Sequence, residues 1–136
     1  MNKKFLYNIL LASFFLLSIV FISCDDTITN SDIDNINIPS KNVSFAKYIQ
    51  PVFNVKCATS GCHDDITMAS GYSLTTWSNA VIPGIVDPFS VETSSLVWRI
   101  EAIGAPIMPP IGPKPPLTLN QIKGIKTWIS EGAENN

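Results

Sequence analysis

Two cysteines and the only histidine of the chain lie within ten residues, KCATSGCHDD, at positions 56–65. The cysteines are Cys57 and Cys62, and His63 directly follows the second one. Thiols and an imidazole gathered in this way are typical of three sites: a small disulfide loop, a zinc site, or the attachment site of a covalent haem. The other residues of the chain must discriminate between these three chemistries.

Zinc and a disulfide each leave part of the pattern without a role. A structural zinc site needs four ligands, and Cys57, Cys62 and His63 supply three. The fourth would have to be a carboxylate from residues 64–65, and the adjacent Cys62 and His63 side chains point in different directions. A disulfide would suit an oxidising compartment, but it leaves His63 and the proline-flanked Met108 unexplained.

A covalent haem gives every residue of the cluster a role. Two cysteines add to the two vinyl groups of haem, and the histidine directly after the second cysteine lies under the iron. The usual spacing is C-x-x-C-H, whereas four residues separate Cys57 from Cys62 here. The two additional residues must bulge, and Ser60 and Gly61 form a permissive pair for such a bulge.

The second axial ligand of such a haem is predicted to be Met108. With one histidine in the chain, ligation by two histidines of the same chain is excluded. Met68 follows His63 by five residues, so at roughly 3.3 Å per residue it reaches the opposite face only when fully stretched. Met108 has ample chain, and three nearby prolines reduce the entropy lost when its thioether binds iron.

Three stretches together resemble a known family: FAKYIQPVFNVKCATSGCH, IMPPIG and PLTLNQIKGIKTWISEGAENN. They are similar to the small monohaem cytochrome c domain of exported bacterial proteins, especially Bacteroidetes-type lipoproteins, over nearly all of residues 43–136. The resemblance implies an all-α, class I cytochrome c-like fold, with three or more helices and long proline-rich loops around one covalent haem c. It also implies that Met108 is the distal ligand and that the closing helix packs on the first one.

Three helices are expected. The first is capped by Ser44 and is interrupted at Pro51, either as a kink or as the start of a second short turn. The second covers residues 95–102, with a cap at residues 94–95. The third begins at a capping box of Thr118 and Gln121, and Gly132 ends it. Its expected buried stripe is Leu119, Ile122, Ile125, Trp128 and Ile129.

The N-terminus is typical of an export signal. Lys3 and Lys4 precede an apolar run over residues 5–22, which is also barely long enough for an uncleaved membrane anchor. VFISC, ending at Cys24, resembles the lipobox of bacterial lipoproteins, in which the cysteine is diacylated and the signal is cut just before it. The predicted organisation is a signal at 1–23, a flexible acidic tether at 24–41 and the cytochrome c domain at 42–136.

Charge excludes one class of partner. The formal net charge is −2, and it becomes −4 if Lys3 and Lys4 are removed with the signal. Without a basic stripe the chain is not expected to bind nucleic acid, and it is expected to reach the membrane only through its lipid. Export places it in the cell envelope, facing the periplasm or exposed on the outer surface.

The sequence therefore predicts an electron carrier and not an enzyme, because an iron with two protein ligands has no open position for substrate. Its partners would be redox proteins. Two alternatives remain: a haem enzyme or sensor whose Met108 is displaceable, and a cofactor-free interaction domain with a Cys57–Cys62 disulfide.

Arg99, the only arginine, is either a haem propionate partner or an ordinary surface residue. Tyr72 and Trp77 are weaker propionate candidates, and Trp98 and Trp128 are expected in the core.

Overall fold

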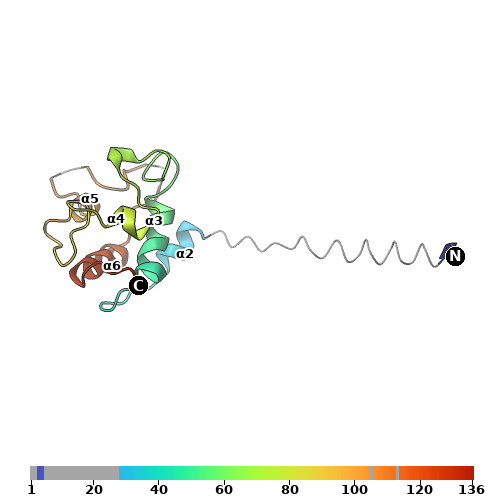
Figure 1. The fold of residues 1–136 in the computed structure, drawn as a ribbon, viewed down its shortest axis with the longest axis horizontal. Coiled ribbons are helices and arrows are strands. Elements are labelled where there is room, and N and C mark those ends of the chain that lie inside the picture. The colour runs from blue at the N-terminus through green and yellow to red at the C-terminus, as the bar shows by residue number, and fades with distance from the viewer. Residues whose placement is uncertain (1–2, 5–27, 105, 113) are drawn as a thin grey trace.

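The structure is a computed structural model that describes residues 3–4, 28–104, 106–112 and 114–136 (Figure 1). The predicted all-α class is confirmed, since these ranges hold helices and turns, and their only β pairing is an isolated bridge between Asp87 and Ser90. The elements are α2 (Asn30–Asp34), the π-helical turn η2 (Phe45–Ile49), α3 (Gln50–Lys56), the 3-10 turn η3 (Ala69–Gly71), α4 (Trp77–Ala80), α5 (Ser95–Ile100) and α6 (Leu119–Ser130).

Apart from Lys3 and Lys4, the predicted signal lies outside the described residues, and so do its cleavage site and Cys24. None of the helices in the described ranges combines the length and the apolarity that crossing a bilayer requires. The lipid anchor therefore stays a prediction from the sequence.

The first predicted helix forms as two joined segments, η2 and α3. Ser44 caps it as expected, since its hydroxyl oxygen accepts a hydrogen bond from the N–H of Lys47 at 3.2 Å. Pro51 is the second residue of α3, where a missing N–H leaves no helical hydrogen bond unmade. The wider π-helical turn ends just before it, and this spares the proline ring a clash with the preceding turn. Pro51 thus lies in the first turn of a second helical segment.

The closing helix α6 is largely as predicted. Both hydrogen bonds of the Thr118–Gln121 capping box are present, and Gly132 follows the helix with φ at 106°, a conformation that suits glycine. Ile125, Trp128 and Ile129 are buried. Leu119 is 75% exposed, so its place in the buried stripe was predicted wrongly. As the first residue of the helix, it lies beyond the part that packs on the domain.

Helix α5 is shorter than predicted. It begins at Ser95 as expected but ends at Ile100, because Ala102 adopts a left-handed φ of 57°. Ser94 stands at the N-cap position without capping the helix. Its hydroxyl instead accepts from the N–H of Asp87 at 2.9 Å and donates to the carbonyl of Ser90 at 2.8 Å. Ser94 therefore fixes the preceding loop and not the helix end.

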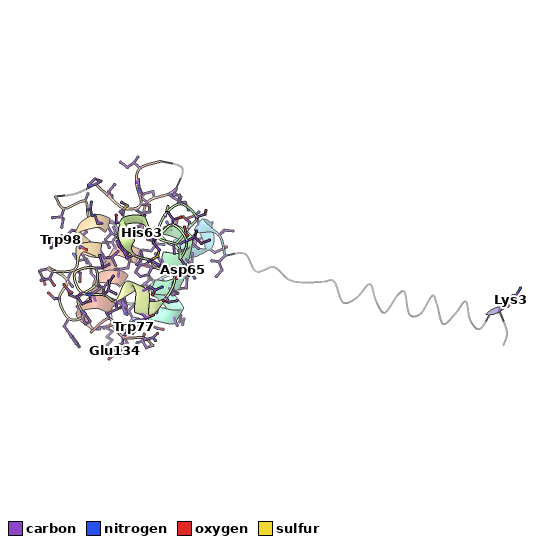
Figure 2. The ribbon with its side chains drawn as sticks, turned by 45° about the horizontal axis from the view of Figure 1, so that its top comes forward. Lys3, His63, Asp65, Trp77, Trp98 and Glu134 are labelled. Atoms are coloured by element: carbon purple, nitrogen blue, oxygen red, sulfur yellow. The ribbon has the colours of Figure 1, made fainter. Side chains whose placement is uncertain are left out.

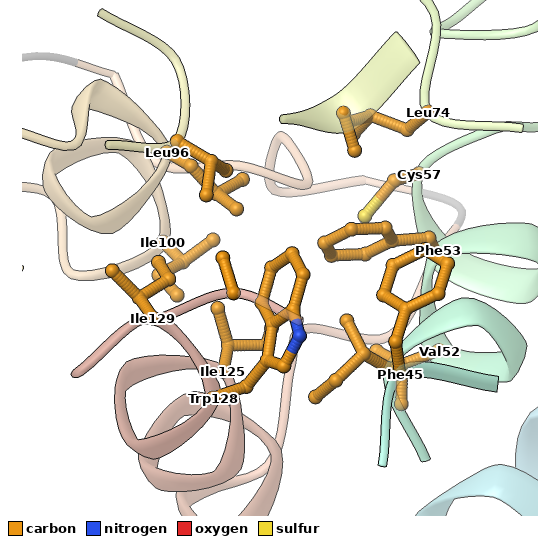
Figure 3. Packing of buried hydrophobic residues seen from close by; sticks show 14 of the residues in the cluster. Phe45, Val52, Phe53, Cys57, Leu74, Leu96, Ile100, Ile125, Trp128 and Ile129 are labelled. Carbon is orange, nitrogen blue, oxygen red and sulfur yellow. The ribbon is translucent and has the colours of Figure 1, made fainter. Parts of the chain in front are cut away.

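The core joins the first and last helical segments, as the family resemblance implied. The Trp128 ring of α6 lies 5.2 Å from the ring of Phe45 and 6.3 Å from that of Phe53, measured between centroids. Figure 3 shows these rings between the two segments, with Leu96 and Ile100 of α5 closing one side. This packing places the cysteine at the end of α3 across the core from Leu96 and Ile100 of α5.

The expected tether over 24–41 differs from what is found in its described part, residues 28–41. Thr29 and Asp32 form a capping box that starts α2. Ile33 is fully buried and Ile38 is 4% exposed. The side-chain oxygen of Asn120 on α6 accepts from the N–H of Ile38 at 2.9 Å. The folded domain therefore already includes Thr29 and does not begin at residue 42, because scattered isoleucines without helical or strand periodicity find partners in distant elements.

Replacement of a buried isoleucine tests this correction. We expect Ile33→Ala to lower the free energy of unfolding by about 2–5 kcal/mol, because it removes fully buried methyl groups from the core. Ile28 is 54% exposed, and Ile28→Ala should change stability by less than about 0.5 kcal/mol. Urea denaturation of the two variants measures the difference. Equal, small effects would restore the tether interpretation.

Candidate functional site

A cavity of about 280 Å³ opens beside the core, and we call it the central cavity. All five site residues predicted for the domain line it: Cys57, Cys62, His63, Arg99 and Met108. They come from the loop after α3, from α5, and from the proline-rich loop before α6. The remaining wall is mainly apolar, with Leu74, Leu96, Ile100, Pro109, Pro110 and Ile111 among its residues.

The cysteine segment is shaped by the end of α3. Cys57 follows the last helical residue, and its N–H still donates to the carbonyl of Phe53 at 2.9 Å. The expected bulge is present, since Gly61 takes the left-handed conformation with φ at 82°. The N–H of His63 then donates to the carbonyl of Cys57 at 3.1 Å, which closes the loop. Both thiols and the imidazole are thereby brought to one cavity wall.

The two thiols differ in their surroundings. Cys57 is buried and Cys62 is half-buried, and their sulfurs are not bonded to each other. Burial raises the pKa of the Cys57 thiol to about 12, and the neighbouring Cys62 adds to the rise. Figure 3 shows the Cys57 side chain among the core residues, close to Phe53 and below Leu74. Cys57 therefore stays a neutral thiol at ordinary pH.

The imidazole of His63 is held in a defined orientation. His63 is 7% exposed, and its ring stacks on the ring of Tyr72 with centroids 4.4 Å apart. Its Nδ1 lies 3.3 Å from the backbone carbonyl oxygen of Tyr72. A carbonyl oxygen only accepts, so Nδ1 carries the proton and donates it, and in the neutral ring Nε2 keeps its lone pair. This is the arrangement that a metal-binding histidine needs.

The two acids after His63 hold the following loop in shape. Asp64 accepts from the N–H of Thr67 at 2.8 Å, and hydrogen bonds from Thr67 are the main cause of the lowering of the Asp64 pKa to about 2. Asp65 accepts from the hydroxyl of Ser73 at 2.7 Å, which lowers its pKa also. Both acids thus lie in the loop after His63, and hydrogen bonds to their carboxylates shape it.

Met108 lines the cavity although it lies far from the two cysteines in the sequence, whereas Met68 does not line it. The N–H of Met108 donates to the carbonyl of Arg99 at 2.8 Å, which fixes the loop against α5. Met68 is 43% exposed and is absent from the cavity lining. Its N–H donates to the carbonyl of Asp64, so it belongs to the turn after His63.

The tyrosine and tryptophans considered as propionate partners or core residues lie in different environments. Tyr72 lines the central cavity. Trp77 does not, and its indole N–H donates to the carbonyl of Ala133 at 2.6 Å. Trp128 is buried in the core as expected, whereas Trp98 is 43% exposed and lies at the edge of the domain in Figure 2. The core prediction for Trp98 is thus wrong, and Trp77 is not available as a propionate donor.

Sequence reasoning missed two lysines at the cavity. Lys56 is fully buried and forms an ion pair with Asp34 of α2 at 2.5 Å, and it also donates to the carbonyl of Pro116 at 2.8 Å. Lys114 borders the same cavity and donates to the hydroxyl of Thr59. Lys56 directly precedes Cys57, but no pattern in the sequence indicates its partners.

The zinc alternative receives no structural support from these positions. Within the described ranges, no three side chains of histidine, cysteine, aspartate or glutamate come together in a way that could hold a metal ion. The chemistry at the cavity is instead two thiols, one imidazole nitrogen and one thioether against an apolar wall. Such a set suits a large apolar cofactor with a central metal better than a bare ion.

Comparisons with known proteins do not assign this chain to a family. No protein-family model, no curated protein and no solved structure matches it. The likeness to monohaem cytochrome c domains therefore rests on the residues and motifs of the chain itself.

Proposed function

We propose that the chain is an electron-transfer protein that carries one covalently attached haem c. His63 and Met108 are its axial ligands, and a lipid on Cys24 attaches it to a membrane of the cell envelope. One observation carries the proposal: Cys57, Cys62, His63 and Met108, which are up to 51 residues apart in the sequence, line one largely apolar cavity. A disulfide loop does not require such a convergence.

The residues at the cavity fit the requirements of this cofactor. Cys57 and Cys62 supply the thiols for two thioether bonds, and His63 offers a lone pair on Nε2 because its Nδ1–H is engaged. The cavity volume of about 280 Å³ is close to the lower end of the range of cofactor pockets, about 300–1,000 Å³. The haem would supply one-electron chemistry between ferrous and ferric iron.

The side chains around the cofactor set its properties. A thioether ligand favours ferrous iron and raises the reduction potential relative to ligation by two histidines. Leu74, Leu96 and Ile100 would give the haem an apolar wall. Arg99 is the proposed propionate partner, because it lines the cavity and a guanidinium suits a carboxylate.

The lipid gives the carrier its place of action. A protein tethered to the membrane meets membrane-bound redox partners at a high effective concentration. His63 and Met108 would together leave the iron no position for a substrate, and this would favour electron transfer over catalysis on a bound substrate. The described part of the domain begins near Thr29, so the link between lipid and domain is shorter than the sequence alone suggested.

A visible spectrum followed by extraction tests the proposal. The exported protein should be red and low-spin, and its colour should stay with the chain after denaturation and acid–organic extraction, because two thioether bonds hold the haem. Haem that enters the organic phase would contradict covalent attachment. A high-spin spectrum would favour the haem enzyme or sensor, and a colourless protein would favour the disulfide-containing interaction domain.

A further inference from the structure

The loop that carries Met108 is fixed at both ends. At one end the N–H of Met108 donates to the carbonyl of Arg99 on α5. At the other end the Lys56 ammonium on α3 donates to the carbonyl of Pro116 at 2.8 Å. Lys56 precedes Cys57, so this second contact joins the Met108 loop directly to the helix that ends at the cysteine segment.

The position of Lys56 depends on a carboxylate from the N-terminal segment. The Lys56 side chain has no exposed surface, and its ammonium pairs with Asp34 at 2.5 Å. Asp34 is itself held in place, since it accepts from the side-chain amide of Gln121 at 3.0 Å. Gln121 belongs to the capping box of α6 and also donates to the carbonyl of Ile33. Helix α6 thus fixes α2 so that Asp34 faces Lys56.

A buried ammonium stays in place only when its donors are satisfied. An uncompensated buried charge is strongly unfavourable, and a lysine has a long flexible side chain by which its ammonium can move to water. If Asp34 lost its charge, Lys56 would swing out of the protein and release the carbonyl of Pro116. The ion pair is therefore a condition for the contact between α3 and the Met108 loop.

We propose that Asp34 and Lys56 are positioning residues for the distal ligand: their ion pair clamps the Met108 loop onto α3 and so keeps the thioether on the iron. This inference rests on the proposed function. It also gives the N-terminal segment a role in the haem site, although none of that segment's described residues lines the cavity. Lys114, which donates to Thr59 in the cysteine loop, is a second contact between the same parts of the chain.

Competition by an external ligand measures how firmly Met108 is held. Imidazole binds ferric iron only when the sixth position is open, so its apparent affinity follows the fraction of protein with Met108 displaced. We expect the Asp34→Asn variant to bind imidazole about 10-fold more tightly than the wild type. This is the effect of losing one hydrogen bond from a charged donor, the one from Lys56 to the carbonyl of Pro116. The thioether charge-transfer band of the ferric protein should weaken in parallel.

A double variant keeps the test valid if Asp34→Asn does not fold. Asp34→Asn combined with Lys56→Leu removes both charges, and replacing a buried ion pair by neutral groups is often tolerated. Leucine is chosen over methionine because a second thioether at the cavity could bind the iron. The double variant lacks the contact to Pro116, so it should also bind imidazole about 10-fold more tightly.

Two controls separate the clamp from general loosening. Asp32→Asn removes a charge from the same helix but keeps a side-chain oxygen that can accept from the N–H of Thr29 at the start of α2. Glu101→Gln removes one charge of the partly exposed pair with Lys126, which is 2.7 Å long. Both should bind imidazole as the wild type does. If the double variant also matched the wild type, the clamp would be overturned while the haem proposal stood. A wild type without covalent low-spin haem would overturn the proposed function itself.

Discussion

The Cys57→Ser and Cys62→Ser variants are expected to yield little or no mature haem-bearing protein. Each substitution removes one of the two thiols that would hold the haem. The domain is small, and small exported domains depend on a covalent or metal staple because their cores bury little surface. The measurement is haem staining of the exported protein on a denaturing gel, together with its abundance in the envelope fraction.

A substitution in the spacer is the matched control. Ser60 lies between the two cysteines and is exposed, and Ser60→Ala keeps both thiols and the left-handed Gly61. We expect this variant to stain and accumulate like the wild type. If either cysteine variant accumulated normally without haem stain, the domain would fold without the cofactor, and the interaction-domain alternative would gain support.

The helices that could be predicted carry their signals locally. The capping box at Thr118 and the stripe through Ile125 and Trp128 are adjacent in the sequence, and they specify α6 without knowledge of any other element. Ser44 and Pro51 likewise mark the starts of the two joined segments of the first helix, η2 and α3. Leu119 shows the limit of this reasoning, because periodicity places a side chain on a face but not against a partner.

The N-terminal segment could not be predicted in the same way. Thr29 and Asp32 do form a recognisable capping box, but the helix that follows has five residues and one buried side chain, Ile33. So short a helix gains its stability from tertiary contacts and not from its own propensity. Asp34 meets Lys56 because α2 packs beside α3 and Gln121 of α6 donates to the Asp34 carboxylate.

The candidate site also combines residues that the sequence could predict with contacts that it could not. Cys57, Cys62 and His63 are adjacent in the sequence, so their types and spacing were enough to single them out. Met108 was found by elimination among three methionines, and the structure places it at the cavity while Met68 stays outside. The stacking of Tyr72 on His63 is a contact that no sequence pattern specifies.

Replacement of Met108 should have the most specific effect on the proposed iron site. If its sulfur binds iron, Met108→Ala vacates the sixth position and three changes follow. The weak charge-transfer band of ferric thioether ligation disappears, and the reduction potential falls because thioether donation no longer favours ferrous iron. Imidazole or cyanide then binds readily. Spectroscopy of the ferric protein and a redox titration measure all three.

Met68→Ala is the matched control for this prediction. Met68 is 43% exposed in the turn after His63, and its backbone N–H, which the substitution keeps, makes the contact with Asp64. The charge-transfer band, the potential and the imidazole affinity should therefore stay as in the wild type. The reverse pattern, in which Met68→Ala opens the iron and Met108→Ala does not, would mean that the loop containing IMPP only completes the cavity wall. The chain would then have to rearrange around His63 to bring Met68 to the iron, since Met68 lies outside the lining of the central cavity.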